Sequence, residues 1–195
     1  MSTVARHASR LGLVALCVLV ASCASRSTSI ERTWTSRDAQ LGELDAVATM
    51  FVTDDVRVRH TSEERMAAAL LRSGIYAVPS YRILGDAPLG REETRARLRA
   101  ARLDGVVSMR VVSQGEERHV RTRSSFGYRG LPWTTTSVEA KPVTQVETVA
   151  YSERRNRVIW ASLSKAIDPE SVVSMVERVT QIVTREMNKD GIISA

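Results

Sequence analysis

In the first half of the chain, short apolar runs alternate with segments whose apolar residues recur at helical spacing. Residues 45–53 form a nearly continuous apolar run that predicts a buried strand, and residues 60–73 carry an apolar stripe that predicts a helix. Thr61 and Glu64 fit a capping box near the start of this helix, and Gly74 suits the position after its end.

A second strand and helix follow along the chain, and then a third strand. Residues 75–83 predict a second strand, in which Pro79 lacks a backbone donor and therefore favours an edge position or a bulge. Residues 91–103 predict a second helix, with acidic residues near its start and arginines after them, and residues 106–112 predict a third strand. This β-α-β-α-β order predicts right-handed crossovers and a partly parallel sheet.

The second half of the chain predicts antiparallel structure. Residues 113–142 are polar with scattered aromatic residues, which predicts a mobile hairpin or a long loop. Alternating apolar positions predict strands over residues 142–152 and 157–165. A tight turn joins them, in which Asn156 is expected to adopt the left-handed conformation.

A long helix is predicted to close the chain. Asp168 is expected as its N-cap with Pro169 in the first turn, and its valines repeat at i, i+4, i+7 and i+11. Ile192 and Ile193 are expected to fold back onto the core. Residues 43–195 therefore predict a single α/β (α+β) domain: a mixed sheet in two or three layers, with a βαβαβ first half, a β-hairpin second half and a long C-terminal helix.

Residues 1–22 have the composition of an export signal. Arg6 and Arg10 give a positive start, and residues 11–21 form an apolar run of about 11 residues. This run is shorter than the stretch of about 20 residues that spans a bilayer. The segment is therefore expected to direct export and to be removed as a signal peptide.

The sequence Val20-Ala21-Ser22-Cys23 resembles the bacterial lipobox, in which an aliphatic residue and two small residues precede a cysteine. The resemblance implies cleavage between Ser22 and Cys23 and covalent lipid on Cys23, where several acyl chains make a strong membrane anchor. An ordinary signal peptide that contains a cysteine is the alternative. By resemblance to enterobacterial lipoproteins, Ala24 in place of an aspartate favours the outer membrane, facing the periplasm.

The composition of the chain limits the disulfides and the partners that can be expected. No cysteine follows Cys23, so the mature domain cannot form an internal disulfide, and residues 23–42, rich in Ser, Thr and Arg, predict a flexible tether. The formal charge of +6 comes mainly from arginine, which can indicate anionic partners or simply a high-GC genome. Because an exported protein does not normally meet nucleic acid, nucleic acid is not expected as a partner.

Several segments resemble a family of uncharacterised bacterial lipoproteins. They are the lipobox, Val52-Thr-Asp-Asp55, Ala77-Val-Pro-Ser-Tyr81, Asp104-Gly-Val-Val107, Val158-Ile-Trp160-Ala-Ser and Lys189-Asp-Gly-Ile192. In wider outline the order of elements resembles the N-terminal domain of the periplasmic protein TolB, and the related domain of CsgG-type secretion lipoproteins and penicillin-binding-protein activators. The resemblance implies a fold type and an envelope location, and it supplies no catalytic residues.

Asp54 and Asp55 are the strongest candidates for a ligand site. They follow the first predicted strand, at the end where α/β sheets bind ligands. The alternative, which we favour, is an N-cap for the following helix. The sequence contains no metal-ligand spacing, phosphate-binding loop or nucleophile elbow, so no metal, further cofactor or catalytic residue is expected.

Arg95, Arg99 and Arg102 form a basic stripe on the second predicted helix. One interpretation is contact with anionic lipid headgroups or glycan. The other is a solvated helix face with ion pairs of the Glu93–Arg97 type.

These features favour a non-enzymatic envelope lipoprotein, held to the membrane by lipid, that binds or scaffolds an envelope protein or peptidoglycan. A hydrolase that uses Asp54 and Asp55 is one alternative. A component of an oligomeric envelope or secretion complex, assembled through residues 113–142, is another.

Overall fold

In the computed structural model, which describes residues 27–87, 89–126 and 132–194, six strands form one mixed sheet. The strand order is β1-β6-β5-β4-β2-β3; β2 is parallel to β3 and β4, and all other neighbours are antiparallel. The strands are β1 (Thr28–Thr35), β2 (Ala46–Val52), β3 (Tyr76–Pro79), β4 (Gly105–Phe126), β5 (Pro132–Ser152) and β6 (Arg157–Ile167).

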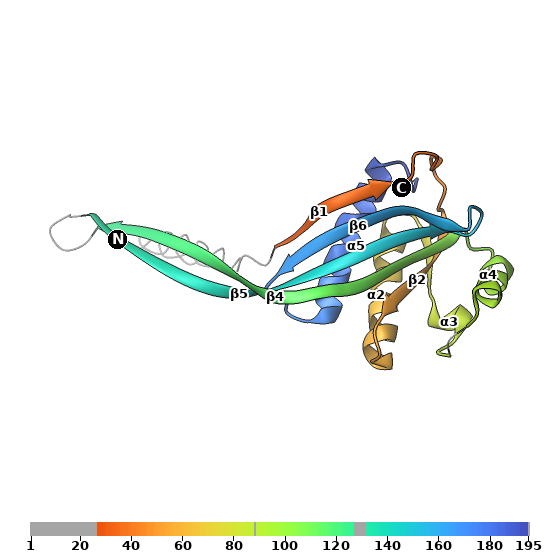
Figure 1. Cartoon of the computed structure of the whole chain (residues 1–195), viewed down its shortest axis with the longest axis horizontal. Helices are drawn as coiled ribbons and strands as arrows, with labels where there is room; N and C mark the ends of the chain where they lie inside the picture. The colour runs from red at the N-terminus through yellow and green to blue at the C-terminus, as the bar shows by residue number, and fades with distance from the viewer. Residues whose placement is uncertain (1–26, 88, 127–131, 195) are drawn as a thin grey trace, which may run out of the picture.

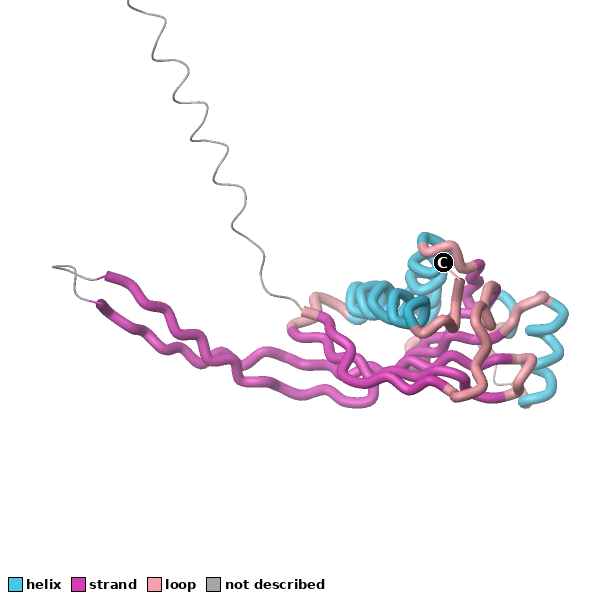
Figure 2. Tube along the Cα trace, turned by 90° about the horizontal axis from the view of Figure 1, so that it is seen from above, coloured by secondary structure: helices cyan, strands magenta, loops and turns pink. Residues whose placement is uncertain are grey.

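The helices within the described ranges lie on both faces of this sheet. They are α2 (Val56–Arg72), α3 (Tyr81–Leu84), α4 (Arg91–Ala100) and α5 (Val172–Lys189). Helices α2 and α5 cover one face, and α4 lies on the other face at the end remote from the long β4–β5 extension (Figure 1, Figure 2). The sheet is therefore three layers thick around β2 and β4 and two layers thick around β6 and β1, which confirms the predicted α/β class and C-terminal helix.

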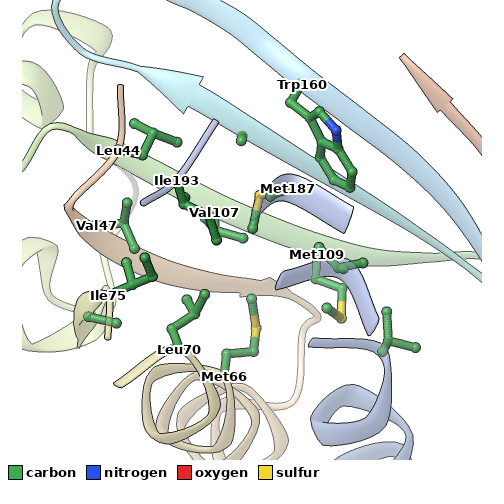
Figure 3. Packing of buried hydrophobic residues seen from close by; sticks show 14 of the residues in the cluster. Leu44, Val47, Met66, Leu70, Ile75, Val107, Met109, Trp160, Met187 and Ile193 are labelled. Atoms are coloured by element: carbon green, nitrogen blue, oxygen red, sulfur yellow. The ribbon is translucent and has the colours of Figure 1, made fainter. Parts of the chain in front are cut away.

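Alternation along β2 and β4 divides the core into two clusters. Val47 and Val107 face α2 and α5, whereas Ala48 and Val106 face α4 and contact Leu98. Successive side chains of a strand point to opposite faces, so each strand supplies both clusters. The larger cluster includes the fully buried side chains of Leu44, Met66, Leu70, Ile75, Met109, Trp160 and Met187 (Figure 3).

Helix α2 begins at Val56, before the predicted capping box at Thr61 and Glu64, so that part of the prediction was wrong. The N-cap is Asp55, whose carboxylate accepts two backbone N–H groups of the first turn at 2.9 and 3.1 Å. These bonds satisfy donors that a helix start leaves free. At the other end Gly74 has a φ of +84°, which confirms the predicted glycine after the helix.

The second strand is shorter than predicted. β3 ends at Pro79 and lies at the edge of the sheet, which confirms the consequence expected from that proline. Ser80 then donates its backbone N–H to the carbonyl of Thr49 (2.8 Å) and accepts from the N–H of Leu84 (2.8 Å). These bonds turn the chain into α3 instead of continuing the strand.

Residues 28–35 form β1, although the sequence placed them in a flexible tether over 23–42. They pair antiparallel with β6, and Ile30 packs against the main core cluster. The remaining side chains of β1 are mostly exposed, with Trp34 52% exposed, so hydrophobic pattern alone does not reveal this strand. The free edge of β6 supplies the hydrogen bonds that order it.

Strands β4 and β5 run far beyond the rest of the sheet. β2 pairs with β4 as far as Arg110, and β6 pairs with β5 only from Val143 onward. Beyond these points β4 and β5 pair with each other alone, and we call residues 113–126 and 132–142 the ribbon (Figure 1). The predicted hairpin is confirmed, and in the described residues it is continuous strand rather than a loop.

Helix α5 is capped by Ser171 rather than by Asp168, so the predicted cap was wrong. The Ser171 hydroxyl accepts the N–H of Ser174 (3.1 Å), and the Ser174 hydroxyl accepts the N–H of Ser171 (3.2 Å). This reciprocal pair satisfies two backbone donors at once. Ile192 and Ile193 are fully buried, which confirms that the chain folds back onto the core.

Candidate functional site

A cleft of about 300 Å³ lies at the carboxyl ends of β2 and β3, between α2, α3 and the loop before α4. This is the end of a parallel sheet at which α/β proteins bind ligands. Phe51 and Leu84 contribute to its apolar wall, and Arg59, Glu63 and Asp86 contribute its charged groups. The cleft is therefore the natural place to test the carboxylates that the sequence singled out.

Asp54 and Asp55 do not line this cleft. The Asp55 carboxylate is occupied as the cap of α2, and Asp54 is exposed at the strand end. The structure thus gives Asp55 the role that the sequence favoured. The hydrolase hypothesis stays a prediction.

Glu63 is the buried carboxylate of the cleft and is fully buried. Its Oε1 accepts the backbone N–H of Phe51 (3.3 Å) and the hydroxyl of Ser80 (2.8 Å), and its Oε2 accepts the N–H of Tyr81 (3.1 Å). Three donors replace the water that a carboxylate needs, so Glu63 joins α2 to β2 and α3. Nothing in the sequence marks Glu63 as buried, because a glutamate within a helix normally faces solvent.

In the wall of the cleft, the Asp86 carboxylate has two side-chain partners on α2. It pairs with the Arg59 guanidinium and with His60 Nε2 (2.8 Å), and the His60 ring stacks on Tyr81 with centroids 3.9 Å apart. The hydrogen bond from His60, helped by the charge of Arg59, lowers the pKa of Asp86. Within the described ranges, His, Cys, Asp and Glu form no group of three that could hold a metal ion.

A second hollow, which we call the α4 groove, lies between α4 and the turn from β5 to β6. It encloses about 460 Å³ on the sheet face opposite α2 and α5. Apolar residues line its base, and arginines from α4 and β6 line its rim. The residues that carry these features are Arg91, Arg95, Leu98, Val106, Tyr151 and Arg157.

The three arginines of the basic stripe expected on this helix have different environments in the structure. The Glu93–Arg97 pair of the ion-pair interpretation is present at 2.7 Å, and Arg95 and Arg99 pair instead with Glu153 of the β5–β6 turn, at 3.2 and 2.7 Å. Arg102 follows the end of α4 with a φ of +55°. Of the three, Arg95 alone lines the α4 groove.

The ribbon carries the third candidate surface. Val120 and Val138 lie opposite each other in the register and are 65% and 62% exposed. Thr122, Thr136 and Arg118 occupy the neighbouring register positions on the same face and are also exposed. A cross-strand pair of this kind stabilises a sheet best when it is covered, and here no described element covers it.

The predicted lipidation site, Ser22 and Cys23, lies outside the described residues, and lipidation stays a prediction. Ser27 leads into β1 at the end of the sheet from which the ribbon projects, because Thr28 pairs with Ala166. Across the part of the chain that the structure describes, no helix is both long and apolar enough to cross a bilayer.

No family model matches the chain, and no curated protein matches it by sequence. Among solved structures, the PelC dodecamer from Paraburkholderia phytofirmans is 17% identical, with 87% of this chain and 99% of that chain covered and a TM-score of 0.46. Lipoprotein GNA1162 from Neisseria meningitidis is 13% identical, with 74% and 96% covered and a TM-score of 0.39. These likenesses are too distant to transfer a function, and the resemblance to TolB and CsgG-type domains stays a prediction.

Proposed function

We propose that this protein is a lipid-anchored, non-enzymatic lipoprotein of the bacterial cell envelope that binds an envelope protein through its ribbon. The lipobox at Cys23 supports the anchor, and Ala24 supports an outer-membrane location facing the periplasm. The observation that carries the binding role is the ribbon itself.

A two-stranded ribbon is marginally stable in water when nothing covers it. This one extends beyond both neighbouring strands, so the outer edges of β4 and β5 offer backbone donors and acceptors to a further strand. The exposed pair Val120–Val138 adds an apolar contact in the middle of the ribbon. A partner strand or sheet would satisfy the edges and cover this pair together.

The non-enzymatic part of the proposal is supported by the roles of the carboxylates near the cleft. Asp55 caps α2 and Glu63 is surrounded by three structural donors. A general acid or base must be free to reach the proton that it transfers. Both residues are instead engaged in holding the fold.

Photocrosslinking tests the binding role. We expect p-benzoylphenylalanine placed at Val138 of the full-length protein in its native envelope to give a discrete crosslinked product. The matched control is the same probe at Leu71, an exposed apolar residue of α2 far from the ribbon. Equal labelling at both positions, or none at Val138, would contradict the proposed role of the ribbon.

The anchor is tested separately by intact mass. The membrane-extracted protein should begin at Cys23 and carry added acyl mass, and Cys23→Ser should abolish that addition and release the protein from the membrane. A mature N-terminus at another residue would contradict the lipoprotein assignment without affecting the ribbon.

A second candidate function is a subunit of a homo-oligomeric envelope assembly. It is favoured by the two open edges of the ribbon, because the β4 edge of one copy can pair with the β5 edge of the next. The same crosslinking experiment separates the candidates. Products at whole multiples of the chain mass indicate self-assembly, and a product of another mass indicates a different partner.

A further inference from the structure

The α4 groove has the volume, the apolar lining and the positive charge of a site for a small anionic ligand with an apolar part. Its volume of about 460 Å³ falls in the range of roughly 300–1,000 Å³ that ligand pockets occupy. Leu98 and Val106 are buried at its base, and Val158 is partly exposed beside them. A peptide of a few residues would fit this volume, and one of its apolar side chains would pack against the exposed Val158.

The charge of the groove is positive. Arg91, Arg95 and Arg157 line it, and among its described lining residues none is acidic. Arg95 lies 3.6 Å from Glu92 and shares Glu153 with Arg99, and Asp38 pairs with Arg157, so three carboxylates face the four arginines Arg91, Arg95, Arg99 and Arg157. These acidic groups therefore neutralise the arginines only in part, which favours an anionic ligand.

Arg95 supplies an independent sign that a partner is missing from the groove. Its side chain is 18% exposed, and its Nε is buried with no acceptor among the described residues. A buried donor without an acceptor costs about 1–3 kcal/mol, whereas a carboxylate accepts two parallel N–H groups of a guanidinium. A carboxylate entering the groove would remove that cost.

The position of the groove relative to the membrane anchor favours a peptide over a lipid as its ligand. Ser27 joins β1 beside one end of β6, and the groove lies at the other end, next to Arg157 and Val158. With 11 residues at roughly 3.3 Å each, β6 separates these points by about 35 Å. If the chain is anchored at Cys23, as proposed above, the groove faces away from the leaflet that holds the anchor.

We propose that the α4 groove binds an acidic peptide segment of a partner protein, in which a carboxylate pairs with Arg91 and Arg95 while a neighbouring apolar side chain packs against Val158, next to Leu98 and Val106. The groove is a second binding surface. Helix α4, which lines it, lies at the opposite end of the sheet from the ribbon (Figure 1). One end of the protein would then engage the ribbon's partner and the other an acidic segment.

Fluorescence anisotropy with the detergent-purified full-length protein tests this proposal. The probe is a fluorescent peptide, Leu-Glu-Phe-Asp-Leu, and its amide counterpart, Leu-Gln-Phe-Asn-Leu, reports the contribution of the carboxylates. We expect the acidic peptide to bind at least tenfold more tightly than the amide peptide. Binding should weaken as ionic strength rises, because opposite charges are screened by salt.

Two variants locate the binding site. Arg91→Gln and Arg95→Gln should each weaken binding of the acidic peptide at least fivefold. Arg185→Gln, on the exposed face of α5, is the matched control and should leave it unchanged. Among the described residues Arg91 has no ion-pair partner to lose, so its variant reports binding even if Arg95→Gln lowers the thermal midpoint.

Three results would overturn the proposal. They are no binding of the acidic peptide by the wild-type protein, equal binding of the two peptides, and equal loss in Arg185→Gln. Binding of phosphatidylglycerol vesicles that Arg91→Gln abolishes, without peptide binding, would assign the groove to lipid instead. None of these outcomes depends on crosslinking at Val138, so failure here is distinguishable from failure of the ribbon's role.

Discussion

Strands β4 and β5 keep the same pairing along their whole described length but lie in two different environments. Inside the body, Val107, Val146 and Ala150 are fully buried beneath α2 and α5. In the ribbon, Val120 and Val138 occupy equivalent paired positions and are largely exposed. The difference shows that pairing defines the strands, whereas burial by the helices should provide most of their stability.

The largest effect should come from placing a charge in each environment. Val146→Asp buries a carboxylate with no donor and should lower the free energy of unfolding by more than about 4 kcal/mol. Val138→Asp, at an exposed position of the same strand, should change it by less than about 0.5 kcal/mol. Urea denaturation of both variants measures the contrast. A large loss from Val138→Asp would mean that the ribbon is covered in the free protein.

A smaller contrast is expected between two neighbouring glutamates of α2. In the wild type three donors bond to the Glu63 carboxylate, and Glu63→Gln places an amide NH₂ against some of them. This substitution should lower the free energy of unfolding by about 3 kcal/mol. Glu64→Gln changes an exposed group bonded to Tyr81 and Arg82, and should cost less than about 1 kcal/mol. Equal losses in thermal or urea unfolding would contradict the structural role assigned to Glu63.

A pH-dependent effect should come from Glu43 in the body. Burial opposes ionisation of Glu43, but hydrogen bonds from the Gln40 N–H, Ser152 and Arg155 outweigh it and lower its pKa. A carboxyl group whose pKa is lowered in the folded state stabilises the fold at every pH above its ordinary pKa. This stabilisation is lost as the pH falls through the folded-state pKa. Stability should therefore decline in acid, below the ordinary value of 4.5.

Arg155→Gln tests that origin. It removes the 2.6 Å bond to Glu43 and should cost about 2 kcal/mol near neutral pH. The difference from the wild type should narrow as the pH falls through the lowered pKa of Glu43, because Glu43 then becomes protonated in both proteins. Arg185→Gln serves as the control, and parallel pH profiles for all three proteins would rule out the assigned role.

The smallest of these effects concerns the start of α2. Asp55→Ala removes the N-cap and should lower the free energy of unfolding by about 1 kcal/mol. Asp54→Ala should leave it nearly unchanged, since Asp54 is exposed. Loss of a hydrolytic activity in Asp54→Asn at an unchanged thermal midpoint would support the hydrolase hypothesis.

Elements with a strong local signal were predictable. The apolar runs of β2 and the valine stripe of α5 identify a buried strand and a helix with one buried face, and both are present. Pro79 correctly placed β3 at an edge, because a missing backbone donor has the same consequence in any sheet. Helix starts were less certain, because Asp55 and Ser171 compete as caps with nearby Thr61 and Asp168.

The candidate binding surfaces were predicted less well. The sequence identified Arg95 but could not show that it lines a groove whose other walls come from β4, β5 and β6. Glu63 has no local sign of burial, because its three donors come from distant residues of the chain. The length of the ribbon was also missed, because polar strands with both faces exposed show little hydrophobic alternation.

The sequence by itself determined the targeting prediction, the α/β order and the hydrophobic faces, since each depends on residues close together in the chain. Only the tertiary structure decided that residues 28–35 form a strand, that Glu63 is buried, and that the ribbon and the α4 groove lie at opposite ends of one sheet. The physical reason is that hydrogen-bond partners, burial and concave surfaces arise from segments far apart in sequence. For β1 that partner is the free edge of β6, which lies more than a hundred residues later in the chain.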